Sequence, residues 1–238
     1  MTTLMANASP RGGARIIGAV YLLYFVTAIL AGFFQRGLII SGDAAATTNN
    51  ILAHEALFRL GLATGLISTA CYIAVTALLY ELFWSVNSSL SLVAAFFSLV
   101  GCAIQAFGSL FQLAPLVVLR GNPYLSDIKI EQSRALTLVF LEMHAQAVNI
   151  CLVFFGIYCL LIGYLIFRSA FLPRLLGVLM AFAGLGWLSF LSPPLANTLS
   201  PHILVLGFIA ELSLCLWLLV MGVNAQRWLE QAGERQAG

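Results

Sequence analysis

Glu142, His144, Gln146 and Asn149 lie inside an almost unbroken apolar run from Ala135 to Phe167. A helix needs about 20 apolar residues to cross the hydrocarbon core of a bilayer, and this run exceeds that length. An ionisable side chain inside such a helix costs roughly 2.5–3.5 kcal/mol on insertion scales, so it marks a candidate functional site. A carboxyl group in this setting could bind a polar molecule or exchange a proton.

Polar side chains form a stripe in this run and a second stripe in the apolar run before it. The two stripes are Glu142, Gln146 and Asn149, and Gln105, Ser109 and Gln112. Each has the spacing i, i+4, i+7, which places its members on one helical face. Consecutive spans are antiparallel, so Gln112 is predicted to lie level with Glu142. The side chains of the two stripes could then hydrogen-bond to each other. Their role would in that case be limited to holding the two helices together, at about 0.6 kcal/mol per pair.

A polar, outward-opening cavity is the functional alternative. Helical rise places His144 about 14 Å and Glu211 about 13 Å from the outer ends of their spans. Gln112, Glu142, His144 and Glu211 would line the cavity, although His144 lies about 160° around the helix from Glu142. Further polar residues are predicted at the outer interface; they are Asp43, His54, Glu55, Arg59 and His202.

Local motifs for metal binding and catalysis are missing from the sequence. Histidines and carboxylates on one side could hold a metal or haem iron, but no HxxxH or HxxE pair supports this, and no cofactor is predicted. No Walker A, Rossmann, HExxH or GxSxG pattern occurs, so an enzyme is the least favoured class. The five cysteines lie in apolar runs and are predicted to be inert packing residues.

Some of the remaining residues are expected to have structural roles. Glu55 and Arg59, at i and i+4, form a helical ion pair or alternatively contact an anion or lipid headgroup. Glycines at positions such as Gly61 and Gly65 allow helices to approach closely. Trp84 and Trp228 are predicted interface anchors.

The composition is that of a membrane protein. Of 238 residues, 61% are hydrophobic and 8% charged, and the mean hydropathy is +1.00. The predicted fold is all-α, a bundle of six transmembrane helices within residues 15–224. The spans are 16–34, 57–83, 90–119, 135–167, 172–191 and 203–223.

The connections and ends are expected to differ in kind. A short interfacial helix is predicted around Asp43–His54, and prolines are predicted to break the helix between Ser192 and His202. Residues 1–14 form a predicted disordered N-terminus, and the tail 225–238 is expected to be disordered from Glu230.

Arginines at the first span set the expected orientation. Arg11 and Arg15 precede this span and only Arg36 follows it closely, which favours cytoplasmic N- and C-termini. The net charge of +2 and the lack of a basic patch argue against nucleic acid. The expected partners are the lipid bilayer and a possible small-molecule ligand, and an oligomer is possible.

Several segments resemble a bacterial membrane family called domain of unknown function 4386, from about Arg15 to Val223. They are Ser41-Gly-Asp-Ala-Ala-Ala-Thr47, Asn50-Ile51, Leu57-Phe-Arg59-Leu-Gly61, Phe154-Phe-Gly156, Gly163-Tyr-Leu-Ile-Phe-Arg168-Ser169, Leu172-Pro173-Arg174-Leu-Leu-Gly177 and Glu211-Leu-Ser-Leu-Cys-Leu-Trp217-Leu-Leu. The most specific stretch is Phe-Arg-Ser-x-Phe-Leu-Pro-Arg. The resemblance implies six helices in a bacterial inner membrane and no activity. Shared polar residues would be Asp43, Arg59, Arg168, Arg174 and Glu211.

Two function classes remain open from the sequence. The first is a small transporter or ligand-binding membrane protein with an outward-facing cavity, in which protonation of a carboxylate would be coupled to substrate movement. The second is a structural or accessory membrane protein, whose polar residues fix helix packing or bind a partner. A solvent-reachable cavity touching Glu142 or Glu211 favours the first, and sealed, hydrogen-bonded carboxylates favour the second.

Overall fold

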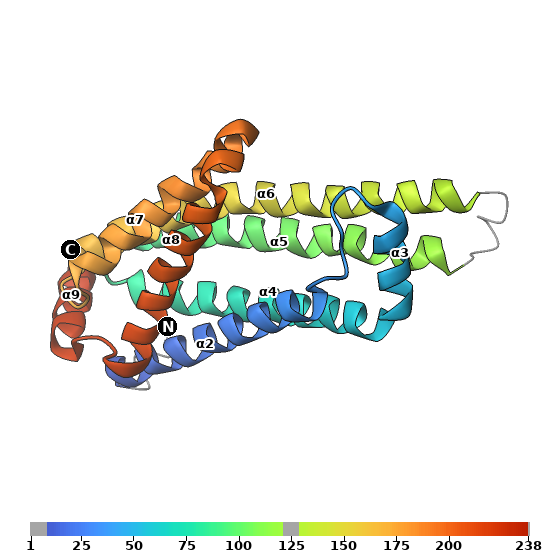
Figure 1. The fold of residues 1–238 in the computed structure, drawn as a ribbon. Coiled ribbons are helices and arrows are strands. Elements are labelled where there is room, and N and C mark those ends of the chain that lie inside the picture. Colours follow the sequence, from blue (N-terminus) through green and yellow to red (C-terminus); the bar gives the residue numbers. More distant parts are fainter. Residues whose placement is uncertain (1–8, 121–128, 238) are drawn as a thin grey trace. The chain divides into compact units, whose positions relative to one another are not determined.

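The computed structural model describes residues 9–120 and 129–237, and these residues are almost entirely helical (Figure 1). The α-helices are α2 (Pro10–Gln35), α3 (Ala44–Ala53), α4 (Glu55–Phe83), α5 (Ser88–Leu119), α6 (Ile130–Arg168), α7 (Arg174–Leu188), α8 (Pro193–Val220) and α9 (Ala225–Ala237). A short 3-10 helix, η2 (Ser189–Leu191), follows α7.

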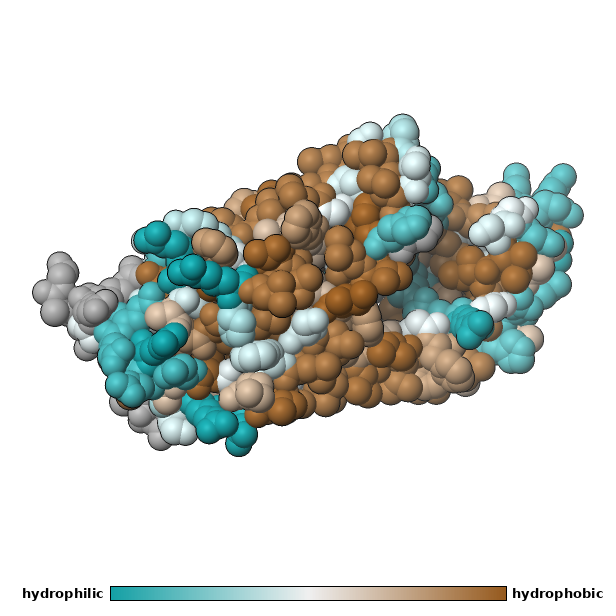
Figure 2. Space-filling model, turned by 60° about the vertical axis from the view of Figure 1, so that its left-hand side comes forward, coloured by the Kyte–Doolittle hydropathy of each residue, from teal (hydrophilic) through white to brown (hydrophobic). Residues whose placement is uncertain are grey.

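Six helical segments of the described chain are long and apolar enough to cross a membrane, which confirms the six predicted spans. They lie in α2, α4, α5, α6, α7 with η2, and α8. The face drawn in Figure 2 is covered mostly by hydrophobic side chains. Exposed side chains such as Phe33, Leu175 and Leu191 are the lipid-facing surface expected of a multi-pass membrane protein.

The chain divides into two compact units. Unit 1 comprises Met1–Leu23, Cys71–Cys102 and Ile150–Gly238, and unit 2 comprises Tyr24–Ala70 and Ala103–Asn149. The long helices α2, α4, α5 and α6 each contribute one part to each unit.

Unit 1 has an aromatic core in which tyrosines from three helices meet. Tyr21, Tyr72 and Tyr158 are at most 1% exposed. The ring of Tyr72 contacts the rings of Tyr21 and Tyr158 edge-on, with centroids 5.8 and 6.2 Å apart. Helix α7 lies against α6 in the same unit (Figure 1), where a Cβ on Gly163 would come within 2.7 Å of the Gly177 carbonyl oxygen.

Unit 2 has a smaller core that fixes the predicted short helix, α3. Buried Ile51 of α3 belongs to one cluster with Leu38, Phe58, Leu116 and Leu141. Asp43 caps α3, since its carboxylate accepts a hydrogen bond of 2.8 Å from the amide of Ala46. The helix predicted around Asp43–His54 is therefore present.

The chain ends and the proline segment are more helical than predicted. Helix α2 already begins at Pro10, and α9 continues through the tail to Ala237, where disorder was expected from Glu230. Trp228 of α9 is buried and donates from Nε1 to the Leu82 carbonyl at 3.1 Å, which ties the tail to unit 1. The disorder predicted for residues 1–8 and 238 lies outside the described residues.

The break predicted between Ser192 and His202 is present only at Ser192, which separates η2 from α8; the residues after it are helical. Helix α8 begins at Pro193, where a proline is tolerated because the first amide of a helix has no partner.

Candidate functional site

A cavity of about 560 Å³ lies in unit 2, between the end of α2, the loop after it, and the facing sides of α5 and α6. Three of the predicted cavity residues line it, namely Gln112, Glu142 and His144. Gln35 and Ser41 add two polar side chains that the sequence did not single out. The rest of the wall is mainly apolar, with residues such as Ile39, Ile40, Leu138, Val139 and Leu141.

Gln112 is the buried polar group of this cavity. Its side chain comes from α5 and is only 4% exposed. Its amide nitrogen, Nε2, is buried and has no hydrogen-bond partner among the residues that the structure describes. A buried amide N–H without a partner costs about 1–3 kcal/mol, and Gln112 therefore needs an acceptor that the described side chains do not supply.

Glu142 is the charged group of the cavity and is exposed. Its Oε1 accepts a hydrogen bond of 2.7 Å from Nε2 of Gln146, which lies one turn later in α6. Because an ionised carboxylate has about four acceptor positions, most of its capacity remains for another donor.

The side chains of the two polar stripes could have bonded to each other, but their hydrogen bonds lie within each helix instead. Gln146 bonds to Glu142, and Asn149 donates to Oε1 of Gln146 at 3.4 Å, both within α6. Ser109 donates to the Gln105 carbonyl within α5 at 3.1 Å. Groups three or four residues apart on one helix are already neighbours, so these bonds form without aligning two helices.

His144 reaches the backbone of α5. Its Nδ1 lies 3.0 Å from the carbonyl oxygen of Gly108. The close approach depends on small residues, since a Cβ on Gly108 would lie 2.7 Å from Cβ of Ala147. His144 and Glu142 are about 160° apart around α6, yet both border the cavity.

Glu211 does not line this cavity, contrary to the prediction. It belongs to unit 1, is 7% exposed, and accepts hydrogen bonds at its Oε2 from two tyrosine hydroxyls. The distances are 2.8 Å to Tyr21 and 3.3 Å to Tyr72. Glu211 is therefore a sealed carboxyl group held by α2 and α4.

The predicted outer-interface residues have mainly structural contacts. Glu55 accepts hydrogen bonds from Arg59, at 2.6 Å, and from Arg120, so the ion-pair interpretation of Arg59 is the one the geometry supports. Asp43 is the N-cap residue of α3, and His54 is the C-cap residue of the same helix. His54 and His202 are exposed.

Among the described residues, histidines, cysteines and carboxylates do not gather into a metal-binding group. Within residues 9–120 and 129–237, no three of these side chains lie close enough to hold a metal ion. All five cysteines are free, and four of them are buried.

The sequence did not identify Tyr21 and Tyr72 as partners of Glu211. They are 190 and 139 residues away from it along the chain. The available indication was chemical, because a tyrosine inside an apolar span needs a partner for its hydroxyl group.

Comparison with known proteins identifies a family for this chain. The profile described as Domain of unknown function (DUF4386) matches residues 16–222. No curated protein and no solved structure matches the chain.

Proposed function

The chain belongs to the DUF4386 family, whose description assigns no activity, and we propose a function from the chain's own residues. The protein binds a small polar molecule in the cavity of unit 2. The ligand carries a hydrogen-bond acceptor that faces Gln112 and a cationic donor group that faces Glu142.

The observation that carries this proposal is the unpartnered amide of Gln112. Polar groups this deeply buried are nearly always hydrogen-bonded, and here no described side chain supplies the acceptor for Nε2. Its side chain borders a cavity of about 560 Å³, which is within the size range of ligand sites. An oxygen atom of a ligand in the cavity would accept the hydrogen bond that Nε2 of Gln112 does not make within the protein.

The charge of the wall indicates the ligand's other end. Glu142 is the one carboxylate among the lining residues, and no lysine or arginine is among them. Together with the apolar residues of the wall, this favours a small amine with a short apolar part over an anion.

The test uses the purified protein in detergent and three matched probes: n-butylammonium, butyrate and n-butanol. A ligand at 100 times its Kd stabilises the folded state by about 2.7 kcal/mol. We expect n-butylammonium to raise the melting temperature and the other two to have little effect. The Glu142→Gln variant should lose this difference.

Glu131→Gln is the control, because Glu131 is exposed in the first turn of α6 and does not line the cavity. It should keep the full response to n-butylammonium. Equal responses to the three probes in the wild-type protein, or an unchanged preference in Glu142→Gln, would refute the proposal.

Transport is the extension of this proposal. A bacterial inner membrane with both termini in the cytoplasm would place the cavity on the outer side, because the loop after α2 lies at its mouth. Protonation of Glu142 would then release the bound cation and couple binding to movement. A transport assay in vesicles with Glu142→Gln tests this step, since the variant should bind weakly and transport nothing.

A structural or accessory role is the second candidate, and one observation favours it. Glu211 is sealed and hydrogen-bonded, as expected for a residue that fixes helix packing. Under this role, replacing Gln112 or Glu142 would change stability alone, and no probe would stabilise the protein.

A further inference from the structure

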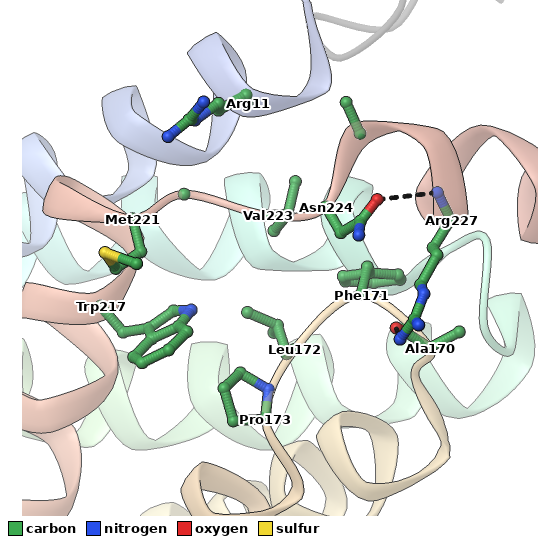
Figure 3. A pocket seen from close by; sticks show the side chains of 12 residues that line it. Arg11, Ala170, Phe171, Leu172, Pro173, Trp217, Met221, Val223, Asn224 and Arg227 are labelled. Atoms are coloured by element: carbon green, nitrogen blue, oxygen red, sulfur yellow. Dashed lines mark hydrogen bonds between the residues drawn. The ribbon is translucent and has the colours of Figure 1, made fainter.

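A second pocket, of about 590 Å³, lies in unit 1 where several helix ends meet (Figure 3). Its wall comes from the start of α2, the turn between α6 and α7, the end of α8 and the segment that leads into α9. The start of α2, the turn after α6 and the end of α8 each lie at one end of an apolar segment that is long enough to cross a membrane. The pocket therefore lies at the level where a bilayer changes from hydrocarbon to headgroups.

The charged residues of the pocket are both arginines, Arg11 and Arg227. Both are exposed, and no acidic residue is among the lining residues. Arg227 donates to the Ala170 carbonyl from one nitrogen, at 3.3 Å, which leaves its other N–H groups for a ligand. The pocket consequently has a positive charge that an anion would neutralise.

The backbone at Gly222 is shaped around Arg11. Gly222 has φ +70°, and a Cβ there would lie 2.9 Å from Cγ of Arg11. The turn is fixed by hydrogen bonds from the Gly222 amide to the Trp217 carbonyl, 3.0 Å, and from the Asn224 amide to the Phe171 carbonyl, 3.3 Å. Arg11 is thus seated against an ordered wall.

The opposite part of the wall is apolar. Trp217, Leu172, Pro173 and Met221 lie on one side of the pocket, away from Arg227 (Figure 3). Met221 is 51% exposed. A free inorganic anion would leave this surface uncovered, whereas the glycerol and first acyl carbons of a lipid would cover it.

We propose that this pocket binds the phosphate group of an anionic phospholipid. Arg227 donates to the phosphate, and Arg11, on another side of the pocket (Figure 3), adds positive charge to the wall. The side chains of Trp217, Leu172 and Met221 contact the glycerol and acyl carbons.

The test measures lipid binding to the full chain in detergent by native mass spectrometry. The probes are dioleoylphosphatidylglycerol, dioleoylphosphatidylcholine and inorganic phosphate. We expect phosphatidylglycerol to bind at least about tenfold more tightly than phosphatidylcholine, because each phosphate–arginine bond is charge-assisted. Inorganic phosphate should not displace it.

The double variant Arg11→Gln/Arg227→Gln should lose this preference. The matched control is Arg168→Gln/Arg174→Gln, which removes the same charge from two exposed arginines of the same unit that are not among the lining residues of the pocket. The control should keep the preference to within about twofold, because charges outside the site act only through a screened field.

Three results would overturn the proposal. They are equal binding of the two lipids by the wild-type protein, displacement of phosphatidylglycerol by inorganic phosphate, and an equal loss in the control and the pocket variant. The first two use the wild-type protein, so the proposal stays testable even if a variant does not fold.

Discussion

The hydroxyl groups of Tyr21 and Tyr72 both donate to Oε2 of Glu211, and all three residues are at most 7% exposed. A carboxyl group inside apolar helices is costly unless its oxygens are hydrogen-bonded. The two tyrosines reduce that cost and join α2 and α4 to α8. At the residue scale, this cluster stabilises unit 1, whereas the Gln112 amide nitrogen in unit 2 has no partner among the described residues.

Tyr21→Phe should destabilise the protein, because it removes one of the two donors from a buried carboxyl group. The expected loss is about 1–3 kcal/mol, measured by thermal unfolding in detergent. Tyr164→Phe is the control, since Tyr164 is 50% exposed. The cluster has no stabilising role if the two variants unfold at the same temperature.

Gln112→Leu should leave the ligand-free protein as stable as the wild type or more stable, by up to about 1–3 kcal/mol, because it removes a buried N–H that has no described partner. The same variant should keep the stabilisation by n-butylammonium, because this probe binds through Glu142 and has no acceptor atom for Gln112. Thermal unfolding with and without the probe measures both effects. A clear loss of stability without ligand would instead mean that Gln112 has a structural partner.

The sequence identified Gln112, Glu142 and His144 as cavity residues because polar side chains in apolar spans are few. It could not identify their bonds. Spacing along one helix specifies which residues share a face, but the rotation of α5 relative to α6 decides whether two stripes meet. The Glu211 cluster was missed for a similar reason, since its partners come from two distant helices.

Helices α6 and α7 pack closely in unit 1, and glycines on both make this possible. A Cβ on Gly163 would lie 2.7 Å from the Gly177 carbonyl oxygen, and one on Gly184 would lie 2.7 Å from that of Gly156. Both obstacles are backbone atoms, which cannot rotate away. At the element scale, the glycines spaced seven residues apart on each helix therefore fix the distance between the two helices.

Gly163→Ala should cost about 1–3 kcal/mol, because the added methyl group forces the helices apart. Gly32→Ala provides a matched control on α2, where a Cβ would meet no atom within 4 Å. Thermal unfolding of both variants checks this. The packing explanation would be wrong if Gly163→Ala were as stable as Gly32→Ala.

The element level was the easiest to predict. Apolar runs of about the length of a bilayer crossing or more predicted all six spans, and the short helix expected around Asp43–His54 is α3. The errors are in polar and proline-rich segments. Helix α9 is stable because Trp228 packs into unit 1, and its local composition does not indicate that contact.

The whole molecule is a multi-pass membrane protein, and we infer its orientation in the membrane from the positions of its arginines. Arg11 and Arg15 precede the first span, and the proposed lipid pocket contains Arg11 together with Arg227 from the chain's last helix. If anionic lipid in the cytoplasmic leaflet holds this end, both termini face the cytoplasm.

Reporter fusions test this orientation. A green fluorescent protein fused after residue 238 should fluoresce, and an alkaline phosphatase at the same point should be inactive, since the first works in the cytoplasm and the second outside it. Fusions after Arg120 should give the opposite pair of results. An active phosphatase after residue 238 would reverse the proposed orientation.

We propose above all that unit 2 has an open, negatively charged cavity that binds a cation. Ala145 lines this cavity, is exposed, and lies one turn after Glu142. Its replacement by cysteine therefore places a thiol at the site. Cys71, the partly buried native cysteine, is first changed to alanine, because the other four are buried.

The measurement is the rate at which Ala145→Cys reacts with a positively charged and a negatively charged methanethiosulfonate reagent. The account predicts that the positive reagent reacts faster, that n-butylammonium slows it, and that Glu142→Gln removes the difference. Equal rates for the two reagents with no protection by n-butylammonium would contradict the account.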